Sequence, residues 1–506
     1  MREKMGLHES LWMATAPRIS YPALDDDITV DMAVVGGGLA GLSTALMLNE
    51  SGARVAVLES RSIGTGVSGY TTAKITSLHR RIYHHLLNHF GREKARLYAG
   101  ANEAAIGKMA EISRKYKIAC DFEEKTAYTF AQTGEHLKLI EEEIKAGQDA
   151  GLKMSFVKEI GLPIKIKGAA MLPGQAQYHP RKYMLGLAGA ITDGMGTIYE
   201  NTRVVHIECE GVGPCSLKTE AGNTVTAKDI VITTNYPVHD RDGLYFTRLQ
   251  ASNSYAMGVR IKDKFPDGIF INSEDDGHSF RQAPVPGGEV VIVLDGTHPV
   301  GQGGDILARY RALSEYTRST FDVTAQEYWW TAQDAVSIDE VPYIGSFTEG
   351  HHHLFVATGF RKWGMAHSTV AAQLLSDLIG GRKNPWQEVY NPSRFKPLAT
   401  SGAFVPQAVK TAGRLTEKVL PAASIDTSLI KTGETAVGSL HGEKAVAYKD
   451  GKGNLHVLDR TCMHMGCMVN WNNAELSWDC PCHGSRYNLE GKVLHSPTVM
   501  DLKKIK

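Results

Sequence analysis

The chain has 506 residues, which is too long for one ordinary domain and long enough for a large core. Lys plus Arg (55) equals Asp plus Glu (55), so the charge balance argues against a nucleic-acid or anionic-membrane partner. The N-terminal residues are polar and charged without an apolar signal segment, and no run of about 18 apolar residues occurs. We therefore expect a cytoplasmic protein that has no membrane span.

A glycine motif directly follows the first predicted strand, at residues 31–35. Gly36, Gly38 and Gly41 have G-x-G-x-x-G spacing, a predicted helix and a second strand come next, and Glu59 ends that strand. Gly36 permits a tight turn, Gly38 lets the backbone approach a pyrophosphate, and Gly41 allows close helix packing. Glu59 is placed to accept hydrogen bonds from ribose hydroxyls. The unit predicts dinucleotide binding.

The loop after Glu59 is rich in glycine and hydroxyl side chains, and it continues to Lys74. It resembles the flavin-contacting segment of the D-amino-acid oxidase/glycine oxidase superfamily, which implies FAD as the dinucleotide. The flavin contacts that the resemblance implies are Arg61, Gly66, Thr71, Thr72 and Ala73.

A second segment resembles the C-terminal flavin-binding segment of the same superfamily. It runs from Asp339 through a predicted strand at 354–358 to a helix that starts near Ser368. In that superfamily, loop amides and the helix N-terminus face the pyrimidine edge of the flavin and stabilise its reduced anion. The residues concerned here are Gly345, Gly359, Lys362, Trp363, Gly364 and Met365.

Catalytic candidates come from the same resemblance, and none has the context of an obvious general base. Tyr178 and His179 precede Pro180, which we expect to begin a helix, and both are candidates for the substrate pocket or for a purely structural role. Lys362 is the preferred candidate for the flavin edge. The full set expected near the isoalloxazine ring or the substrate is Lys74, His179, Tyr255, Arg361 and Lys362.

Other histidines and cysteines give weaker signals. His79, His84, His85 and His89 are expected on a solvated or interdomain helix face rather than around a metal, and 351–353 is expected to be a surface turn. The scattered cysteines are interpreted as small buried or surface residues; they are Cys120, Cys209 and Cys215.

Two cysteine–histidine clusters stand near the C-terminus. Cys462 and His464 form the first, Cys480 and His483 form the second, and fifteen residues separate His464 from Cys480. Two cysteines and two histidines fit tetrahedral zinc or a Rieske 2Fe–2S cluster, in which two histidines replace two cysteines on one iron. One Cys and one His from each loop favours the Rieske cluster over zinc. Each loop also carries a spare cysteine.

This segment resembles the Rieske domain of cytochrome bc complexes. The resemblance implies a disulfide between the spare cysteines, Cys467 and Cys482, which ties the cluster loops together. It also implies that the hydroxyls of Ser485 and Tyr487 hydrogen-bond to the cluster and a ligand sulfur. The Rieske proteins of bc complexes are membrane anchored, and here no anchor is expected.

The predicted fold is an α/β FAD-binding domain of the Rossmann-like, glutathione-reductase type with an inserted α+β substrate domain, followed by a small all-β Rieske domain. Residues 1–28 are expected to be a leader on the domain surface, and 391–425 a linker with a helix around Pro406–Val419. The oxidoreductase is predicted at 29–390 (FAD-binding 29–80, 173–245 and 333–390; substrate domain 81–172 and 246–332), and the Rieske domain at 426–506.

This domain order resembles bacterial FAD-dependent oxidoreductases of the amino-acid oxidase superfamily with a C-terminal Rieske domain. It implies a dehydrogenase that oxidises a C–N bond of a small amine or amino acid and passes electrons singly through the cluster to an external acceptor. A Rieske oxygenase is excluded because only 23 residues follow His483, and these leave no room for a downstream iron site. The alternatives are a reductase component that serves a separate oxygenase, and a redox-sensing carrier without a substrate of its own.

Overall fold

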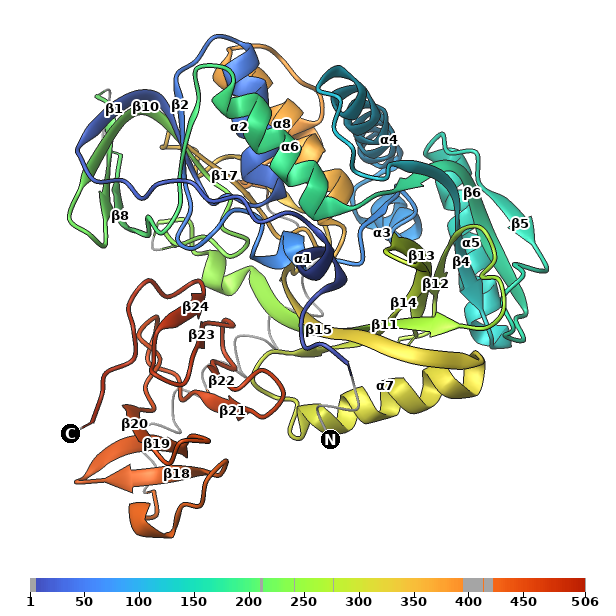
Figure 1. Ribbon diagram of the computed structural model, residues 1–506. Helices are drawn as coiled ribbons and strands as arrows, with labels where there is room; N and C mark the ends of the chain where they lie inside the picture. The colour runs from blue at the N-terminus through green and yellow to red at the C-terminus, as the bar shows by residue number, and fades with distance from the viewer. Residues whose placement is uncertain are drawn as a thin grey trace.

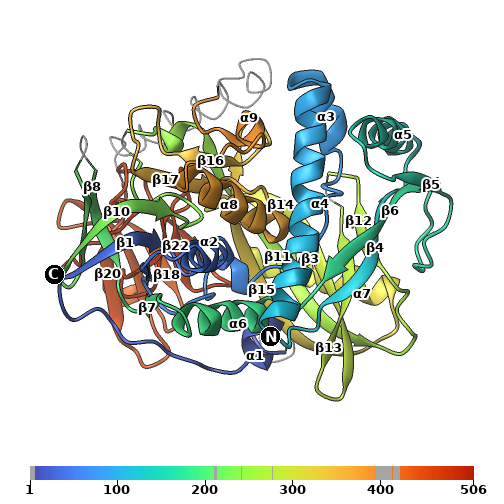
Figure 2. The same cartoon turned by 90° about the horizontal axis from the view of Figure 1, so that it is seen from above.

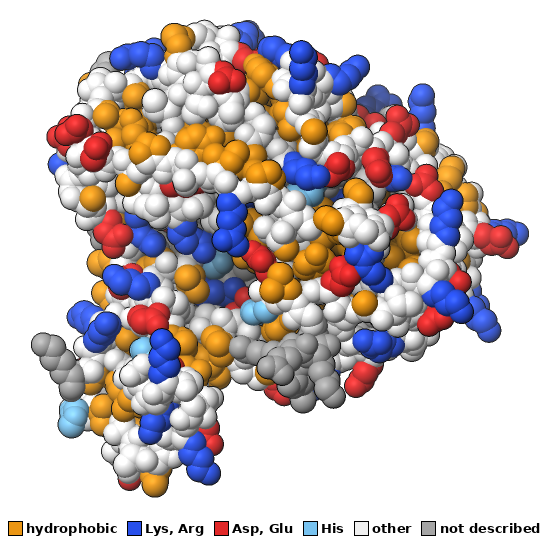
Figure 3. All heavy atoms as spheres, viewed as in Figure 1, with side chains coloured by type: hydrophobic (Ala, Val, Ile, Leu, Met, Phe, Trp, Pro, Cys, Tyr) orange, Lys and Arg blue, Asp and Glu red, His pale blue; other side chains and the backbone are white. Residues whose placement is uncertain are grey.

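The computed structural model describes residues 6–209, 213–240, 242–275, 277–394, 413 and 422–505. A large body contains two sheets, and a small C-terminal domain lies below it in Figure 1; Figure 2 shows the same arrangement from above. In the space-filling view a hollow separates the C-terminal domain from the body on the left side (Figure 3). The fold class is the predicted one.

The first sheet has eight strands and carries the glycine motif. Its central strands are parallel and almost wholly buried, as expected for a sheet covered by helices. Its order is β16 (Tyr343–Ser346), β17 (Leu354–Thr358), β10 (Thr224–Ile232), β1 (Ile28–Val35), β2 (Val55–Leu58) and β7 (Thr197–Tyr199), with the hairpin β8 (Val204–Glu208) and β9 (Cys215–Thr219) beside β10. The covering helices pack on each other; they are α2 (Leu39–Glu50), α6 (Pro180–Thr192) and α8 (Gly364–Ile379).

The second sheet has nine strands. Its order is β15 (Val323–Ser337), β11 (Leu249–Ile261), β14 (Gly288–Pro299), β13 (Ser279–Val285), β12 (Ile269–Asn272), β4 (Glu123–Ala131), β6 (Gly168–Gln177) and β3 (Lys74–Ile75), with β5 (Ser155–Val157) beside β6. The remaining helices of the body are α3 (Ile82–His89), α4 (Arg92–Lys115), α5 (Gly134–Asp149), α7 (Ile306–Thr320) and α9 (Gln387–Tyr390), with the short turn η3 (Tyr245–Thr247).

Some predicted domain boundaries cut through this second sheet. The boundaries at residues 173 and 333 fall within β6 and β15, and β3 belongs to the second sheet although it lies in the predicted FAD-binding range 29–80. The chain crosses between the two sheets inside continuous strands, and a composition change cannot mark such a crossing.

The N-terminal segment is integrated into the body instead of lying on its surface. The short helix α1 (Leu11–Thr15) buries Leu11 and Trp12 almost completely. The Trp12 indole donates to the carbonyl of Thr71 at 2.6 Å, and Ser10 Oγ donates to the carbonyl of Gly69 at 2.5 Å. The predicted leader therefore fixes the loop after Glu59, which contains the turn η2 (Val67–Gly69).

The C-terminal domain is all β in its described part. Two small sheets build it: β18 (Thr435–Leu440), β19 (Glu443–Lys449) and β20 (Leu455–Asp459), then β21 (Asn470–Asn472), β22 (Ser477–Asp479), β23 (Arg486–Tyr487) and β24 (Val493–His495), preceded by the turn η4 (Thr427–Leu429). The helix predicted around 406–419 lies outside the described residues, apart from residue 413. Within the described ranges, no helix combines the length and the apolar character needed to cross a membrane.

Three side-chain predictions need correction. His79 is buried next to α3 rather than solvated, and its Nδ1 lies 2.7 Å from the Tyr98 hydroxyl. Cys209 and Cys215 are joined by a disulfide across the β8–β9 hairpin, which scattered spacing did not indicate. At the expected surface turn, His353 pairs with Asp229 at 2.7 Å and is partly covered.

Candidate cofactor sites

The glycine motif forms the turn that its spacing predicts. Gly36 follows β1 with a φ of +109°, a region that residues with a Cβ rarely adopt. A Cβ added to Gly41 would collide with the Gly36 carbonyl, so only glycine allows α2 to approach so closely. Glu59 Oε2 accepts the Gly37 amide at 2.8 Å, which fixes the loop against the end of β2.

Two adjoining cavities extend from this turn. One reaches the end of β2, and the other reaches the loop before α8. Thr233 and Asn235, at the end of β10, line both. A cavity that passes from a dinucleotide turn to a second chamber fits an elongated cofactor with a diphosphate in its middle. The shared lining is completed by Gly38, Val67 and Ser68.

Most predicted FAD contacts line these cavities. The first cavity includes Gly36, Gly38, Glu59, Arg61 and Gly66, and the second includes Thr71, Thr72, Lys362, Gly364 and Met365.

The remaining predicted contacts do not line either cavity. Gly345 abuts Pro392, and Gly359 packs against β11 and β15. The Ala73 carbonyl accepts from the buried Arg281, and Trp363 stacks on His79 with ring centroids 4.6 Å apart. These four residues shape the loops behind the cavity.

Lys362 lies in the second cavity beside an acid that the sequence did not indicate. Its Nζ donates to Ser254 Oγ at 2.6 Å, and its backbone amide donates to the carboxylate of Asp334. Burial raises the pKa of Asp334 to about 6 and lowers the pKa of Lys362 to about 7. Asp334 and Ser254 had no sequence signal, because they stand on long antiparallel strands without a motif.

Tyr255 and Arg361 point away from the cavity. Ser254 faces the cavity, so its neighbour Tyr255 faces the opposite side of β11, where its hydroxyl lies 3.0 Å from His298 Nε2. Arg361 lines a separate cleft and pairs with Glu340 at 2.8 Å. Both were expected near the isoalloxazine ring, and the structure contradicts that expectation.

His179 and Lys74 also stand outside the cavity lining. His179 is the N-cap of α6, accepts from the Lys182 amide, and contacts Thr15 Oγ1 at 3.0 Å. This is the structural role left open above, and Pro180 begins the helix as predicted. Lys74 Nζ is buried and donates to Thr72 Oγ1 at 2.9 Å, one residue behind the cavity wall.

The C-terminal cysteine–histidine loops bring four unengaged ligand groups together. Cys462 and Cys480 are free, buried thiols, and hydrogen bonds from Cys480 and Tyr487 lower the pKa of the Cys462 thiol to about 6. The rings of His464 and His483 lie 5.0 Å apart, and in the described part of the chain His464 Nδ1 and His483 Nε2 have no hydrogen-bond partner. A thiol pair beside an imidazole pair fits a 2Fe–2S cluster with both histidines on one iron.

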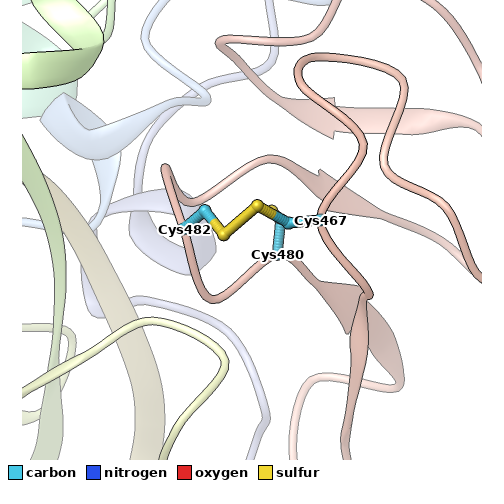
Figure 4. A group of neighbouring side chains, drawn as sticks. All are labelled: Cys467, Cys480 and Cys482. Carbon is cyan, nitrogen blue, oxygen red and sulfur yellow. A yellow bond between two sulfur atoms is a disulfide. The ribbon is translucent and has the colours of Figure 1, made fainter. Parts of the chain in front are cut away.

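The spare cysteines form the disulfide that the Rieske resemblance implied. Cys467 and Cys482 are bonded, with their Cα atoms 6.5 Å apart. Their sulfurs and that of Cys480 lie within 4.8 Å of one another (Figure 4), but the disulfide leaves only Cys480 available as a ligand. The hydroxyls of Ser485 and Tyr487 both favour the thiolate of Cys462.

The cluster loops abut the body on the far side of β15. Gln333 Nε2 donates to the Gly484 carbonyl at 2.6 Å, whereas the next residue, Asp334, faces the second cavity. Gly484 has a φ of +82°, and a Cβ there would collide with Ala251. One strand therefore separates the second cavity from the cluster loops.

The two cluster histidines have different surroundings. His483 is 1% exposed and lies edge-on to Tyr236 and Phe246 of the body. The His464 side chain is 13% exposed and lies 3.6 Å from Asp240 in a wide cleft. Other residues of that cleft are Met463, Met465, His239, Asp242 and Met500.

Comparison with known proteins identifies both parts. Residues 31–378 match the model of the "FAD dependent oxidoreductase" family, and residues 422–506 match the Rieske [2Fe-2S] domain. The chain belongs to the FAD-dependent oxidoreductase family. It carries a C-terminal Rieske domain, so FAD and a 2Fe–2S cluster are its cofactors.

Similar proteins share either the whole architecture or one half of it. The Rieske 2Fe-2S iron-sulfur protein YhfW of Bacillus subtilis is 33% identical over 497 residues, covering 98% of this chain and 97% of that protein. Gamma-glutamylputrescine oxidoreductase of Escherichia coli is 28% identical over 46% of this chain and 55% of its own length. Glycine oxidase from Geobacillus kaustophilus shares the fold, with a TM-score of 0.59 at 19% identity over 72% of this chain and 99% of that chain.

Proposed function

We propose that this FAD-dependent oxidoreductase dehydrogenates a C–N bond of a small amine or amino acid and passes the electrons singly to an external acceptor. The observation that carries the proposal is the position of the Lys362–Asp334 pair. It lines the second cavity one strand away from the cluster loops. A substrate at this pair would be oxidised beside the route to a one-electron carrier.

The reaction balances as R₂CH–NH₂ → R₂C=NH + 2 e⁻ + 2 H⁺, and water then hydrolyses the imine. When bound, FAD supplies a two-electron acceptor for the hydride of the C–H bond, and the cluster supplies a one-electron carrier. Two acceptor molecules are then consumed for each amine. The protein's own task is to bind the amine neutral, take up its proton and keep water away.

Lys362 and Asp334 are suited to that proton transfer. Burial brings the pKa values of both side chains near neutrality, where a general acid or base works best. Ser254 holds the Lys362 ammonium or amine in place. The apolar side of the cavity, formed by Leu294, Ala332 and Phe360, favours a substrate whose amine is uncharged.

The surroundings of the histidines support opposite roles for the two cluster loops. Gly484 and His483 face the body through Gln333 and Tyr236, which suits electron entry from the flavin side. His464 faces the wide cleft, which suits electron exit to the external acceptor. Cys462, His464, Cys480 and His483 are the ligand set that we propose.

The similarities agree with an amine substrate. The names of the related Escherichia coli oxidoreductase and of the structurally similar glycine oxidase refer to an amine and an amino acid. An L-proline dehydrogenase from P. horikoshii also shares the fold, with a TM-score of 0.60. A fused one-electron carrier fits a dehydrogenase better than an oxidase that gives two electrons to oxygen.

The test is anaerobic mixing of the holoenzyme with a panel of small amines and amino acids. We expect flavin bleaching followed by the electron paramagnetic resonance signal of the reduced cluster. Cys480→Ser, which lacks a cluster ligand, should still bleach but should not reduce a one-electron acceptor. Bleaching by NAD(P)H alone would establish the reductase instead, and no bleaching by either class would establish a carrier without a substrate.

A further inference from the structure

A segment of the Rieske domain lines the first cofactor cavity. This segment, residues 493–499, runs from β24 to the loop after it and faces the cavity opposite the glycine motif and Glu59. The cavity-lining members are Val493, Leu494, His495, Ser496, Thr498 and Val499.

Direct hydrogen bonds hold this segment against the body. Ser496 Oγ lies within donating distance of the carbonyls of Thr234 and Tyr236, at 3.1 and 2.9 Å. The Arg203 guanidinium donates to the Val493 carbonyl at 3.2 Å. Thr234 and Arg203 themselves line the cavity, so the Rieske segment is attached to the rim of the site it covers.

We propose that residues 493–499 of the Rieske domain form one wall of the FAD site, against the adenosine diphosphate half of the cofactor. The glycine motif and Glu59 mark this cavity as the half that takes the diphosphate and ribose. The flavin half belongs to the second cavity, where Lys362 lies. The iron–sulfur domain thus contributes to binding a cofactor that it does not itself carry.

The chemistry of the wall suits a nucleotide. Val493, Leu494 and Val499 offer apolar surface, and His495 and Ser496 add a ring and a hydroxyl. Burial, with the positive charges of Arg486 and Arg61, lowers the pKa of His495 well below its usual value. A neutral imidazole covers a nucleotide without adding charge and can accept or donate a hydrogen bond.

This arrangement couples FAD binding to the docking of the Rieske domain. A ligand that contacts both parts stabilises their association, and by reciprocity the docked domain raises the affinity for the ligand. If the Rieske domain moved away, it would remove one wall of the FAD site. The same contacts that bring the cluster loops to β15 therefore help to retain FAD.

Binding of FAD and ADP to the full-length apoflavoprotein tests the proposal. His495→Ala combined with Ser496→Ala should weaken both ligands by roughly five- to tenfold, as expected for lost contacts and hydrogen bonds. A matched control is His456→Ala with Ser428→Ala, on the same domain but outside the cavity lining, and it should bind both ligands like the wild type. Cluster absorbance verifies that each variant is folded.

Two outcomes of that titration would overturn the proposal. One is wild-type affinity for both ligands in the His495/Ser496 variant, and the other is a loss confined to FAD, because ADP is the half that the wall contacts. Neither readout uses turnover, so a wrong substrate class under the proposed function leaves this test unaffected.

Hydrogen exchange on the unmodified chain provides a second test that avoids substitutions. Adding ADP to the full-length apoflavoprotein should slow amide exchange within 493–499, and β19 of the same domain serves as the internal reference that stays unchanged. Equal exchange in 493–499 with and without ADP would contradict the proposed wall.

Discussion

At the scale of single residues, the second cavity contains a backbone segment held in an unfavourable conformation. Arg361 and Lys362 have φ values of +50° and +69°, a region that side chains other than glycine seldom adopt. Such residues cost about 1–3 kcal/mol each and persist only when their surroundings hold them in place. Here the carboxylate of Asp334 accepts the Lys362 amide and Ser254 accepts its Nζ. The chain therefore spends stability to direct one lysine into the cavity.

Lys362 should set the pH dependence of flavin reduction. Because its pKa is lowered to about 7, the side chain loses its proton as the pH rises through that value and can then accept one from the substrate. We expect the rate of flavin reduction to increase from pH 6 to pH 8 in anaerobic stopped-flow experiments. Lys362→Met should abolish this rise and slow reduction by about 10²- to 10⁴-fold.

Lys74→Met is the matched comparison, since Lys74 is a second buried lysine that stands behind the cavity wall. This variant should keep the rise between pH 6 and pH 8. If Lys362→Met retained the same rise, the titrating group would be elsewhere in the protein.

At the scale of elements, β11 and β15 form a partition with a different task on each face. Residues of odd and even number alternate between the faces, so Ser254 and Asp334 belong to the second cavity while Tyr255 and Gln333 belong to the opposite side. The two strands are antiparallel neighbours in continuous register along almost their full length. A shift of one residue would exchange the two faces.

The hydrogen bond across this partition should control the passage of electrons. Gln333→Leu keeps the side-chain size but removes the donor to the Gly484 carbonyl, which leaves that carbonyl without its partner. We expect cluster reduction after flavin bleaching to slow by roughly three- to tenfold, while the bleaching rate itself stays unchanged. Double-mixing stopped-flow with optical detection separates the two steps.

Gln326→Leu provides the control, because Gln326 lies on the same strand but contacts Ser314 rather than a cluster loop. It should leave both steps at the wild-type rate. Equal slowing in the two variants would mean that the strand, and not the contact with Gly484, governs the rate.

The elements also explain which parts of the site could be predicted from the sequence. The glycine motif and the cysteine–histidine loops are local, so their spacing alone identifies the chemistry. Ser254 and Asp334 meet only through the register of two strands 80 residues apart, which no local pattern encodes. The same limit applied to Tyr255, whose polar ring suggested the cavity but whose parity on the strand places it on the other face.

At the scale of the whole molecule, the Rieske domain is docked by several separate contacts. Glu475 is the central one: it accepts from Thr331 Oγ1 at 2.7 Å and contacts His8 at 3.2 Å. Burial opposes its ionisation, but these hydrogen bonds prevail and lower the pKa of Glu475. Asn470 Nδ2 adds a bond of 2.8 Å to the Gly301 carbonyl. A chain segment from each part of the body thus contacts the domain.

Glu475 connects docking to pH in a definite direction. Because its pKa is lower in the docked protein than in an unfolded chain, the ionised carboxylate contributes stability above the unfolded value. That contribution is lost as the pH falls through the lowered value. Docking through Glu475 is therefore fully present at neutral pH, where FAD and the cluster have to work together.

Docking of this kind predicts that electrons reach the cluster without a large domain movement. In the wild type, the rate of cluster reduction after flavin bleaching should be independent of solvent viscosity when sucrose raises it several-fold, since no swing on the μs–ms scale intervenes. Glu475→Ala removes the acceptor for Thr331 and His8, and it should make the rate fall as viscosity rises because the domain must re-dock. Glu490→Ala, at an exposed turn of the same domain, should behave like the wild type. A wild-type rate that falls in proportion to viscosity would show that the domain moves in every turnover.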